Sequence, residues 1–372
     1  MNPLKQLEGY GQSPWLDYIQ RSLLTGGGLR RLIEDDGVKG VTSNPSIFEK
    51  AIAGSNDYRE GMRELRRKGF PSQHIYELLA IEDVRLAADE LRPVYEATAR
   101  RDGYVSLEVS PHLARDTAST VEEARRLWRS VARPNLLIKV PGTPEGIPAV
   151  EALIAEGVNV NVTLLFSRGA YRDAADAYLR GLERRAASGA DISGVASVAS
   201  FFVSRIDTNV DAKLDALIAA AAPGGRARLE GLHGKAAIAN AKLAYRLFQD
   251  LTATARWKRL VRAGAMPQRL LWASTSTKNP AYRDVIYVEE LIGPDTVNTM
   301  PTATIQAFRD HGVARASLQE DVAGAESVMR ELDNAGIAFN GVADELLVEG
   351  VRLFSQAFDS LLATVEQARS AA

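Results

Sequence analysis

The chain has 372 residues, of which 46% are hydrophobic and 25% charged, and its formal net charge is −2. This composition is typical of a globular protein with one large or two medium cores, and it gives no electrostatic attraction for nucleic acid or an anionic membrane. Cysteine is absent, which excludes disulfides, zinc ribbons and a thiol nucleophile. Because the N-terminus lacks the apolar core of a signal peptide and no stretch approaches about 18 apolar residues, we expect a cytoplasmic protein without membrane or nucleic-acid partners.

Short apolar runs alternate with longer helical patterns along the chain. A weak strand candidate at 15–19 is followed by seven clearer ones at 37–42, 104–109, 135–140, 158–166, 194–199, 269–274 and 295–300. Alternating strands and helices predict an α/β fold with a parallel sheet and right-handed crossovers. Eight such strands favour a closed (β/α)8 TIM barrel over an open doubly wound sheet.

Two segments exceed the minimal barrel. Residues 56–100 have the pattern of two or three helices inserted before the third strand, and residues 320–372 follow the last strand. The terminal segment carries apolar residues near helical spacing from Leu346 to Val365, so it predicts a long helix whose apolar face docks on the barrel. We therefore expect one domain over residues 1–372, with a helical insert and a C-terminal helical extension.

Polar residues interrupt three strands that a buried parallel sheet would make continuously apolar. They are Ser106, Glu108 and Ser110 in the third strand, Lys139 in the fourth, and Asn159, Asn161 and Thr163 in the fifth. A period of two places each polar set on one face of its strand, and in a barrel that face is the interior. Barrel enzymes form their sites at the carboxyl ends of the strands, where Glu108, Lys139 and Thr163 fall.

Lys139 has two interpretations. A buried ammonium is costly, so a structural ion pair with Glu108 is one of them. The other is a neutral amine that attacks a carbonyl, with the apolar wall lowering its affinity for a proton. Glu108 is equally open between ion-pair partner and acid/base group, and Asp17 taken alone is an ordinary surface aspartate.

Other chemistries lack support in the sequence. The four histidines are far apart and form no metal-ligand pair, so we expect no metal. No phosphate-binding loop motif and no glycine-rich dinucleotide motif follows a predicted strand, so we expect no nucleotide cofactor.

Five segments in order resemble the transaldolase family. They are residues 40–46 (GVTSNPS), 106–110 (SLEVS), 137–141 (LIKVP), 159–167 (NVNVTLLFS) and 200–205 (SFFVSR). The resemblance extends over the barrel from about Asp17 to Pro301. It implies a cofactor-free transferase of carbohydrate metabolism in the pentose phosphate pathway, which acts on phosphorylated sugars as a monomer or homodimer.

The resemblance also implies roles for single residues. Lys139 matches the Schiff-base lysine, Asp17 the general base of carbon–carbon cleavage, and Glu108 with Thr163 the pair that positions a catalytic water. The matched substrate-binding residues are Asn44, Asn161 and Ser200 for the dihydroxyacetone unit and Arg205 for a phosphate. Phe202 matches a position where transaldolases have Phe and related aldolases have Tyr, and it favours transfer over cleavage.

One segment departs from the family pattern. Residues 273–280 (ASTSTKNP) resemble the stretch that supplies a second phosphate-binding arginine in another branch, but this chain offers Lys278. A lysine can hold phosphate as a point charge, so we expect Lys278 to take that role. The terminal helix of the family tends to lie across the barrel mouth, and we expect residues 320–372 to include that cover. The reaction that the resemblance implies moves a dihydroxyacetone unit from sedoheptulose 7-phosphate to glyceraldehyde 3-phosphate, giving erythrose 4-phosphate and fructose 6-phosphate. Two alternatives stay open: an aldolase that releases free dihydroxyacetone, and a catalytically silent barrel used for binding.

Overall fold

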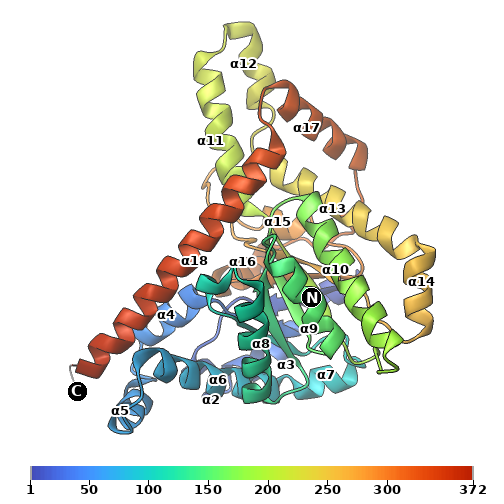
Figure 1. Ribbon diagram of the computed structural model, residues 1–372. Helices are drawn as coiled ribbons and strands as arrows, with labels where there is room; N and C mark the ends of the chain where they lie inside the picture. The colour runs from blue at the N-terminus through green and yellow to red at the C-terminus, as the bar shows by residue number, and fades with distance from the viewer. Residues whose placement is uncertain (1, 371–372) are drawn as a thin grey trace.

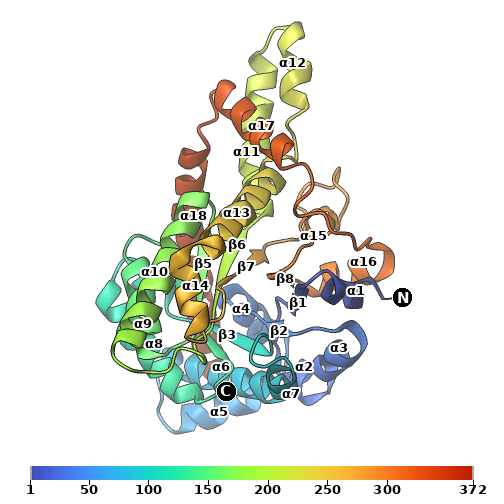
Figure 2. The ribbon, with the colours of Figure 1, turned by 90° about the vertical axis from the view of Figure 1, so that its right-hand side faces the viewer.

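Eight parallel strands close into a barrel in chain order in the computed structural model, so the predicted (β/α)8 barrel is confirmed (Figure 2). The strands are β1 (Gln12–Leu16), β2 (Gly40–Val41), β3 (Tyr104–Glu108), β4 (Leu136–Pro141), β5 (Val160–Leu165), β6 (Ser197–Phe202), β7 (Arg269–Ala273) and β8 (Thr296–Met300). The structure describes the backbone of residues 2–370 and the side chains of residues 2–222 and 225–367. Each strand pairs with its sequence neighbours, and β1 closes the ring on β8.

Helices surround the barrel and cover one of its ends (Figure 1). They are α1 (Pro3–Gly9), α2 (Arg21–Thr25), α3 (Gly28–Asp36), α4 (Pro45–Gly54), α5 (Arg59–Arg67), α6 (Ser72–Glu90), α7 (Arg92–Ala97), the 3-10 helix η1 (Pro111–Leu113), α8 (Thr117–Val131), α9 (Gly146–Glu156), α10 (Arg168–Ala187), α11 (Ser204–Ala220), α12 (Pro223–Glu230), α13 (Ala236–Ala253), α14 (Ala255–Arg262), α15 (Ile286–Glu289), α16 (Thr302–His311), α17 (Val322–Asn334) and α18 (Phe339–Ser370). None of the helices described combines the length and apolar character that a bilayer crossing requires.

The two additions to the barrel are helical where the sequence places them. Helices α5 to α7 lie within residues 56–100, before β3, and α17 and α18 occupy most of residues 320–370. Residues 1, 371 and 372 of the expected domain lie outside the described residues. That the whole chain forms one domain stays a prediction.

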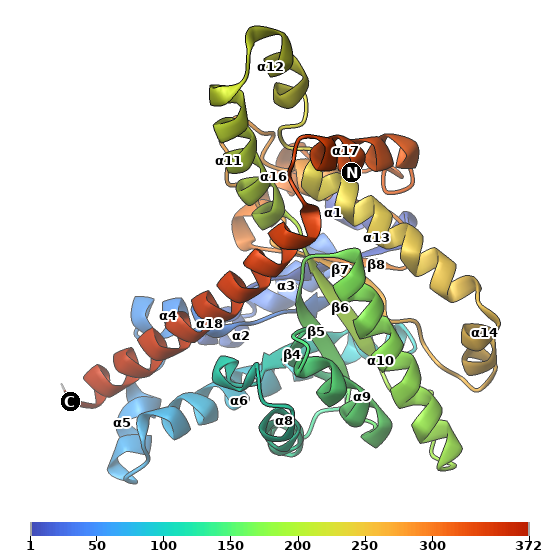
Figure 3. The same cartoon turned by 45° about the horizontal axis from the view of Figure 1, so that its top comes forward.

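The long helix α18 lies across the barrel and extends from α11 to α4 and α5 (Figure 3). Its apolar stripe, which includes Phe354, Phe358, Leu361 and Val365, is buried. Gly350 allows this helix to come close, because a Cβ there would lie 2.9 Å from Leu164 Cδ2 of β5. The helix therefore places its side chains directly above the strands of the barrel.

Two strands are displaced along the chain from their predicted positions, and β2 is shorter than predicted, with Gly40–Val41 in place of residues 37–42. β1 begins at Gln12 instead of residue 15, and β6 ends at Phe202 instead of residue 199. Both contain polar residues that hide a strand pattern and that find buried partners in the fold. Gln12 Nε2 donates to Leu291 O at 2.6 Å, and Ser197 Oγ donates to Val160 O at 2.7 Å.

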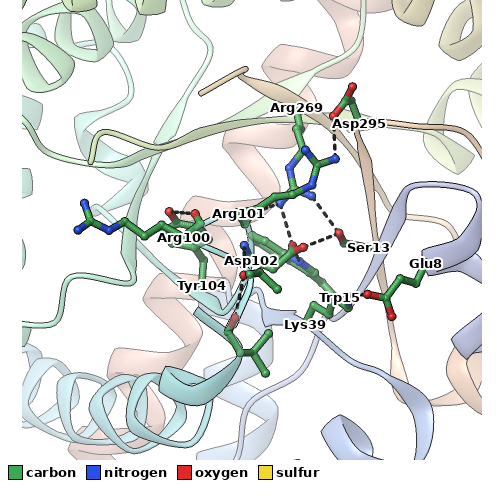
Figure 4. A network of polar contacts seen from close by, with 12 residues as sticks. Glu8, Ser13, Trp15, Lys39, Arg100, Arg101, Asp102, Tyr104, Arg269 and Asp295 are labelled. Carbon is green, nitrogen blue, oxygen red and sulfur yellow. Dashed lines mark hydrogen bonds and ion pairs between the residues drawn. The ribbon is translucent and has the colours of Figure 1, made fainter. Parts of the chain in front are cut away.

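A buried ion pair ties the strands together at the amino end of the barrel (Figure 4). Arg269 Nη2 of β7 lies 2.8 Å from Asp102 Oδ1, and the two side chains are 4% and 3% exposed. Ser13 Oγ and Trp15 Nε1 of β1 also donate to Asp102, at 2.8 and 3.2 Å. Burial alone would raise the pKa of Asp102, but the Arg269 charge and these hydrogen bonds hold it below its usual value.

Removing the Asp102 charge is expected to destabilise the protein without disabling it. In Asp102→Asn, Arg269 stays buried without its counter-charge, a change that costs about 3–5 kcal/mol of unfolding free energy. Chemical denaturation measures this loss, and kcat should stay within about twofold because barrel chemistry occurs at the opposite end. The control is Asp295→Asn, which breaks the 2.7 Å surface pair with Arg101 and should cost about 1 kcal/mol or less. Equal losses in the two variants would contradict the account.

Candidate active site

Three predicted site residues lie side by side across β3, β4 and β5. Glu108 pairs in register with Lys139, and Lys139 with Asn161. Asn161 Nδ2 donates to Ser106 Oγ at 3.0 Å, and Ser200 Oγ of β6 donates to Asn161 Oδ1 at 2.7 Å. The alternating polar residues therefore meet one another inside the barrel, as the period of two predicts.

The amine of Lys139 is buried and has few polar neighbours. Its side chain is 5% exposed, and Nζ donates to Ser43 O at 3.2 Å. Nζ also lies 3.5 Å from Glu108 Oε2, and the centroid of the Phe354 ring is 5.6 Å from Nζ. An amine held by one carbonyl and one distant carboxylate, beneath an aromatic ring, is placed for nucleophilic attack.

Glu108 and Thr163 have buried oxygen atoms without hydrogen-bond partners. Within the described residues, neither carboxylate oxygen of Glu108 nor Oγ1 of Thr163 has one. Burial raises the pKa of Glu108 to about 7, although the Lys139 charge acts in the opposite direction. Unsatisfied buried oxygens are costly, so each of these groups is suited to hydrogen-bond a bound water. A carboxyl group that titrates near neutral pH is suited to general acid–base catalysis.

The raised pKa of Glu108 predicts a pH-dependent stability. The folded chain keeps this proton up to about pH 7, whereas the unfolded chain releases it near 4.5. The stability from the neutral carboxyl is therefore fully present below about pH 4.5 and is lost as the pH rises through 7, at roughly 1 kcal/mol per pH unit. The glutamine of Glu108→Gln cannot ionise. The unfolding free energy of this variant should therefore rise relative to that of the native chain as the pH increases from 5 to 7. Denaturation of both proteins at pH 5, 6, 7 and 8 measures the difference; parallel curves would show that Glu108 does not titrate there.

Asp17 lies one residue after β1, at the carboxyl end of the barrel. Its Oδ1 accepts a hydrogen bond from Thr42 Oγ1 at 2.6 Å, and Thr42 Oγ1 in turn lies 2.7 Å from Thr299 Oγ1. Burial raises the pKa of Asp17, while Lys139 and Thr42 act to lower it. Its backbone is held by the Asp17 N–H bond to Met300 O of β8 at 2.8 Å. A carboxylate with an upward-shifted pKa beside a buried lysine can take a proton from a substrate hydroxyl.

A cavity of about 140 Å³ brings most of the predicted residues together. Of the ten, seven line it: Asp17, Asn44, Lys139, Ser200, Phe202, Arg205 and Lys278. Glu108, Asn161 and Thr163 do not line it, although strand pairing places Glu108 and Asn161 directly beside Lys139. Asn44 has a local structural role as well, because its Oδ1 caps α4 by accepting the N–H of Ile47 at 3.0 Å.

The outer end of the cavity is cationic. Arg205, the second residue of α11, lies with its guanidinium 5.5 Å from the Phe202 ring and 6.0 Å from the Phe354 ring. Its Nη1 is buried without a hydrogen-bond partner among the described residues, and burial lowers its pKa. Lys278 lines the same cavity, and partial burial together with Arg205 and Lys50 lowers its pKa. Two cations with little compensating negative charge suit an anion such as a phosphate.

The structure adds site residues that the sequence analysis missed. Thr42 and Thr299 hold Asp17, Ser274 and Ser276 line the cavity, and Phe354 of α18 covers it. Thr42 lies within the motif at residues 40–46, so its position next to Asn44 was a usable signal. No local signal marks Phe354, which resembles any apolar residue of an amphipathic helix. Within the described residues, no three acidic or histidine side chains gather as a metal site would require.

The fold, the cavity and the neighbours of Lys139 together define a (β/α)8-barrel enzyme with a buried amine and two carboxyl groups, Asp17 and Glu108, at the carboxyl ends of its strands. The family model for transaldolase/fructose-6-phosphate aldolase matches residues 14–365. The chain therefore belongs to this family.

Proteins of several bacteria resemble the chain over nearly its whole length. Transaldolase 2 of Nostoc punctiforme is 52% identical over 369 residues, which are 98% of this chain and 97% of that protein. Transaldolase 2 of Nostoc sp. strain PCC 7120 is 50% identical over 370 residues, with the same two shares. The transaldolase of Thiobacillus denitrificans is 48% identical over 365 residues, 98% of this chain and all of that protein.

Proposed function

We propose that the chain is a transferase that moves a dihydroxyacetone unit from sedoheptulose 7-phosphate to glyceraldehyde 3-phosphate through a Schiff base on Lys139. The observation that carries the proposal is the amine of this lysine, buried at the base of the cavity between Glu108 and the ring of Phe354. The family of the chain and the names of its relatives support the same reaction.

The reaction begins when the Lys139 amine, after it has given up a proton, attacks the ketone carbon of the donor. The carbinolamine that forms loses water to give an iminium, and both steps require proton transfer. Glu108 supplies and accepts these protons through a water shared with Thr163, and the buried oxygens of both side chains can hydrogen-bond it. The pKa of about 7 lets Glu108 act in both directions at neutral pH.

Carbon–carbon cleavage follows. Asp17 takes the proton of the hydroxyl on the fourth carbon, the bond between the third and fourth carbons breaks, and its electron pair is drawn into the iminium. Erythrose 4-phosphate leaves, and the three-carbon unit stays on Lys139. Ser200, Asn161 and Asn44 hold its hydroxyls, while Arg205 and Lys278 bind the phosphate of the departing and the arriving aldehyde.

Transfer requires that the retained carbanion meets an aldehyde before it meets a proton. Phe202 and Phe354 cover the cavity between Lys139 and Arg205, at 6% exposure each, and keep water from the intermediate. Addition to glyceraldehyde 3-phosphate returns a proton from Asp17 to the new alkoxide. Hydrolysis of the iminium then releases fructose 6-phosphate and the free lysine.

An assay of acceptor dependence distinguishes this function from simple cleavage. The chain is incubated with fructose 6-phosphate, with and without erythrose 4-phosphate, and sedoheptulose 7-phosphate and free dihydroxyacetone are both measured. We expect sedoheptulose 7-phosphate only with the acceptor and almost no free dihydroxyacetone. Release of dihydroxyacetone at a comparable rate without the acceptor would make the chain an aldolase, and no turnover would leave a binding barrel.

We also propose the setting of the reaction. Its substrates place it in the pentose phosphate pathway, in the cytoplasm, with no cofactor and with the chain as a monomer or homodimer. These proposals follow from the family.

A further inference from the structure

The loop that carries Lys278 is long and has little regular structure. Residues 274–285 connect β7 to the short helix α15. Lys278 itself is exposed, and its Nζ donates to Ser276 Oγ of the same loop at 2.9 Å. This bond cannot fix the loop relative to the barrel, so the position of the Lys278 charge depends on contacts elsewhere in the loop.

Two tyrosines attach the far end of this loop to α11. Tyr282, four residues after Lys278, donates its hydroxyl to Asp211 Oδ2 at 2.6 Å. Tyr287 of α15 donates its hydroxyl to Asp207 Oδ2 at 2.7 Å. The near end is attached to the same helix, because Ser204 N donates to Ser274 O at 3.0 Å and the two serine hydroxyls lie 2.9 Å apart.

The two aspartates are themselves held by the backbone at the start of α13. Asp207 Oδ1 accepts the N–H of Ala237 at 2.8 Å, and Asp211 Oδ1 accepts that of Gly234 at 3.1 Å. Gly234 has a φ of +67°, and a Cβ there would lie 2.8 Å from Cζ of Tyr282. The ring of Tyr282 therefore rests on a glycine that no other residue could replace without displacing it.

Helix α11 also carries Arg205, two residues before Asp207 and six before Asp211. Helix α11 thus presents Arg205 to the cavity. Through the carboxylates of Asp207 and Asp211, the same helix also holds the loop that carries Lys278. A phosphate that both cations bind requires a constant separation between them, since ion pairing and hydrogen bonding depend steeply on distance.

We propose that Tyr282 and Tyr287, with Asp211 and Asp207, are positioning residues that set the distance between Lys278 and Arg205 and so determine affinity for the phosphate group of the sugar. This inference rests on the proposed function for its substrate, a phosphorylated sugar, and it extends that function to residues outside the cavity. The four side chains do not touch the substrate and act only through the loop and the helix.

The test removes one hydroxyl and leaves the packing in place. Tyr282→Phe keeps the ring on Gly234 and loses the bond to Asp211. The matched control is Tyr178→Phe, which loses a buried tyrosine hydroxyl bonded to Met266 O at 2.7 Å, away from the cavity. Affinity for inorganic phosphate is measured by calorimetry on the full chain and both variants, together with KM and kcat for fructose 6-phosphate and the thermal midpoint.

We expect Tyr282→Phe to bind phosphate about tenfold more weakly and to raise KM by a similar factor, with kcat within about twofold. Tyr178→Phe should leave phosphate affinity and KM unchanged, although its thermal midpoint should fall by about as much as that of Tyr282→Phe. Equal phosphate affinity in Tyr282→Phe and the native chain, or equal losses in both variants, would overturn the inference. So would a native chain that binds no phosphate. Failure of the proposed function has a different signature, namely phosphate binding with no transfer by the native chain.

Discussion

Replacing Lys139 by methionine is expected to abolish transfer, with kcat reduced by at least about 10⁴-fold. Methionine keeps most of the apolar stem and removes the amine, so no iminium can form and no electron sink exists for cleavage. The loss is measured as the rate at which sedoheptulose 7-phosphate forms from fructose 6-phosphate and erythrose 4-phosphate. Residual transfer within a hundredfold of the native rate would show that another group is the nucleophile.

The same variant decides between the two interpretations of Lys139 that the sequence leaves open. Without the lysine charge, the pKa of Glu108 rises further and its carboxyl stays neutral, so no buried charge is stranded. We expect the thermal midpoint to change by only a few degrees, whereas loss of a structural ion pair would cost about 3–5 kcal/mol. Lys242→Met is the matched control. This lysine is also buried, with a carboxylate 3.7 Å away on Glu290 and a carbonyl 3.0 Å away on Glu320, and its loss should not affect transfer.

Replacing Asp17 by asparagine is expected to reduce kcat by about 10²–10⁴-fold while imine formation continues. Asparagine has the shape of aspartate and can still accept the Thr42 hydrogen bond, but it cannot take the hydroxyl proton. Borohydride reduction with fructose 6-phosphate should then trap a six-carbon adduct on the enzyme in place of a three-carbon one.

Asp102→Asn is the control for Asp17→Asn, because it removes a buried carboxylate at the opposite end of the barrel. It should lose stability and keep its kcat. A three-carbon adduct in Asp17→Asn, formed at the native rate, would assign the proton transfer to another residue.

The barrel and the interior of the site could be predicted because both depend on short-range patterns. A period of two in β3 to β5 places Glu108, Lys139 and Asn161 on one face, and strand register alone then brings them together. The reaction itself was predicted from the order of the family motifs, because the alternation of polar and apolar residues does not indicate which reaction a site performs. The roles of the single residues stay predictions until their variants are measured.

Other features depend on contacts between distant parts of the chain. Phe354 reaches Lys139 from a helix more than 200 residues later, and the sequence marks it only as one of several apolar residues on that helix. The polar start of β1 obscured the strand because Ser13 finds its partner in Asp102. The hydrogen bonds that hold the Lys278 loop are also invisible in the sequence, since Tyr282 and Asp211 become neighbours only when α11 packs beside the barrel.

The central claim is that Lys139 holds the three-carbon unit, and one measurement tests it directly. The chain is incubated with fructose 6-phosphate, reduced with borohydride and digested, and the modified peptide is identified by mass. We predict a dihydroxyacetone-derived adduct on Lys139 alone. An adduct on a different lysine, or no adduct in a preparation that is active in transfer, would contradict the account.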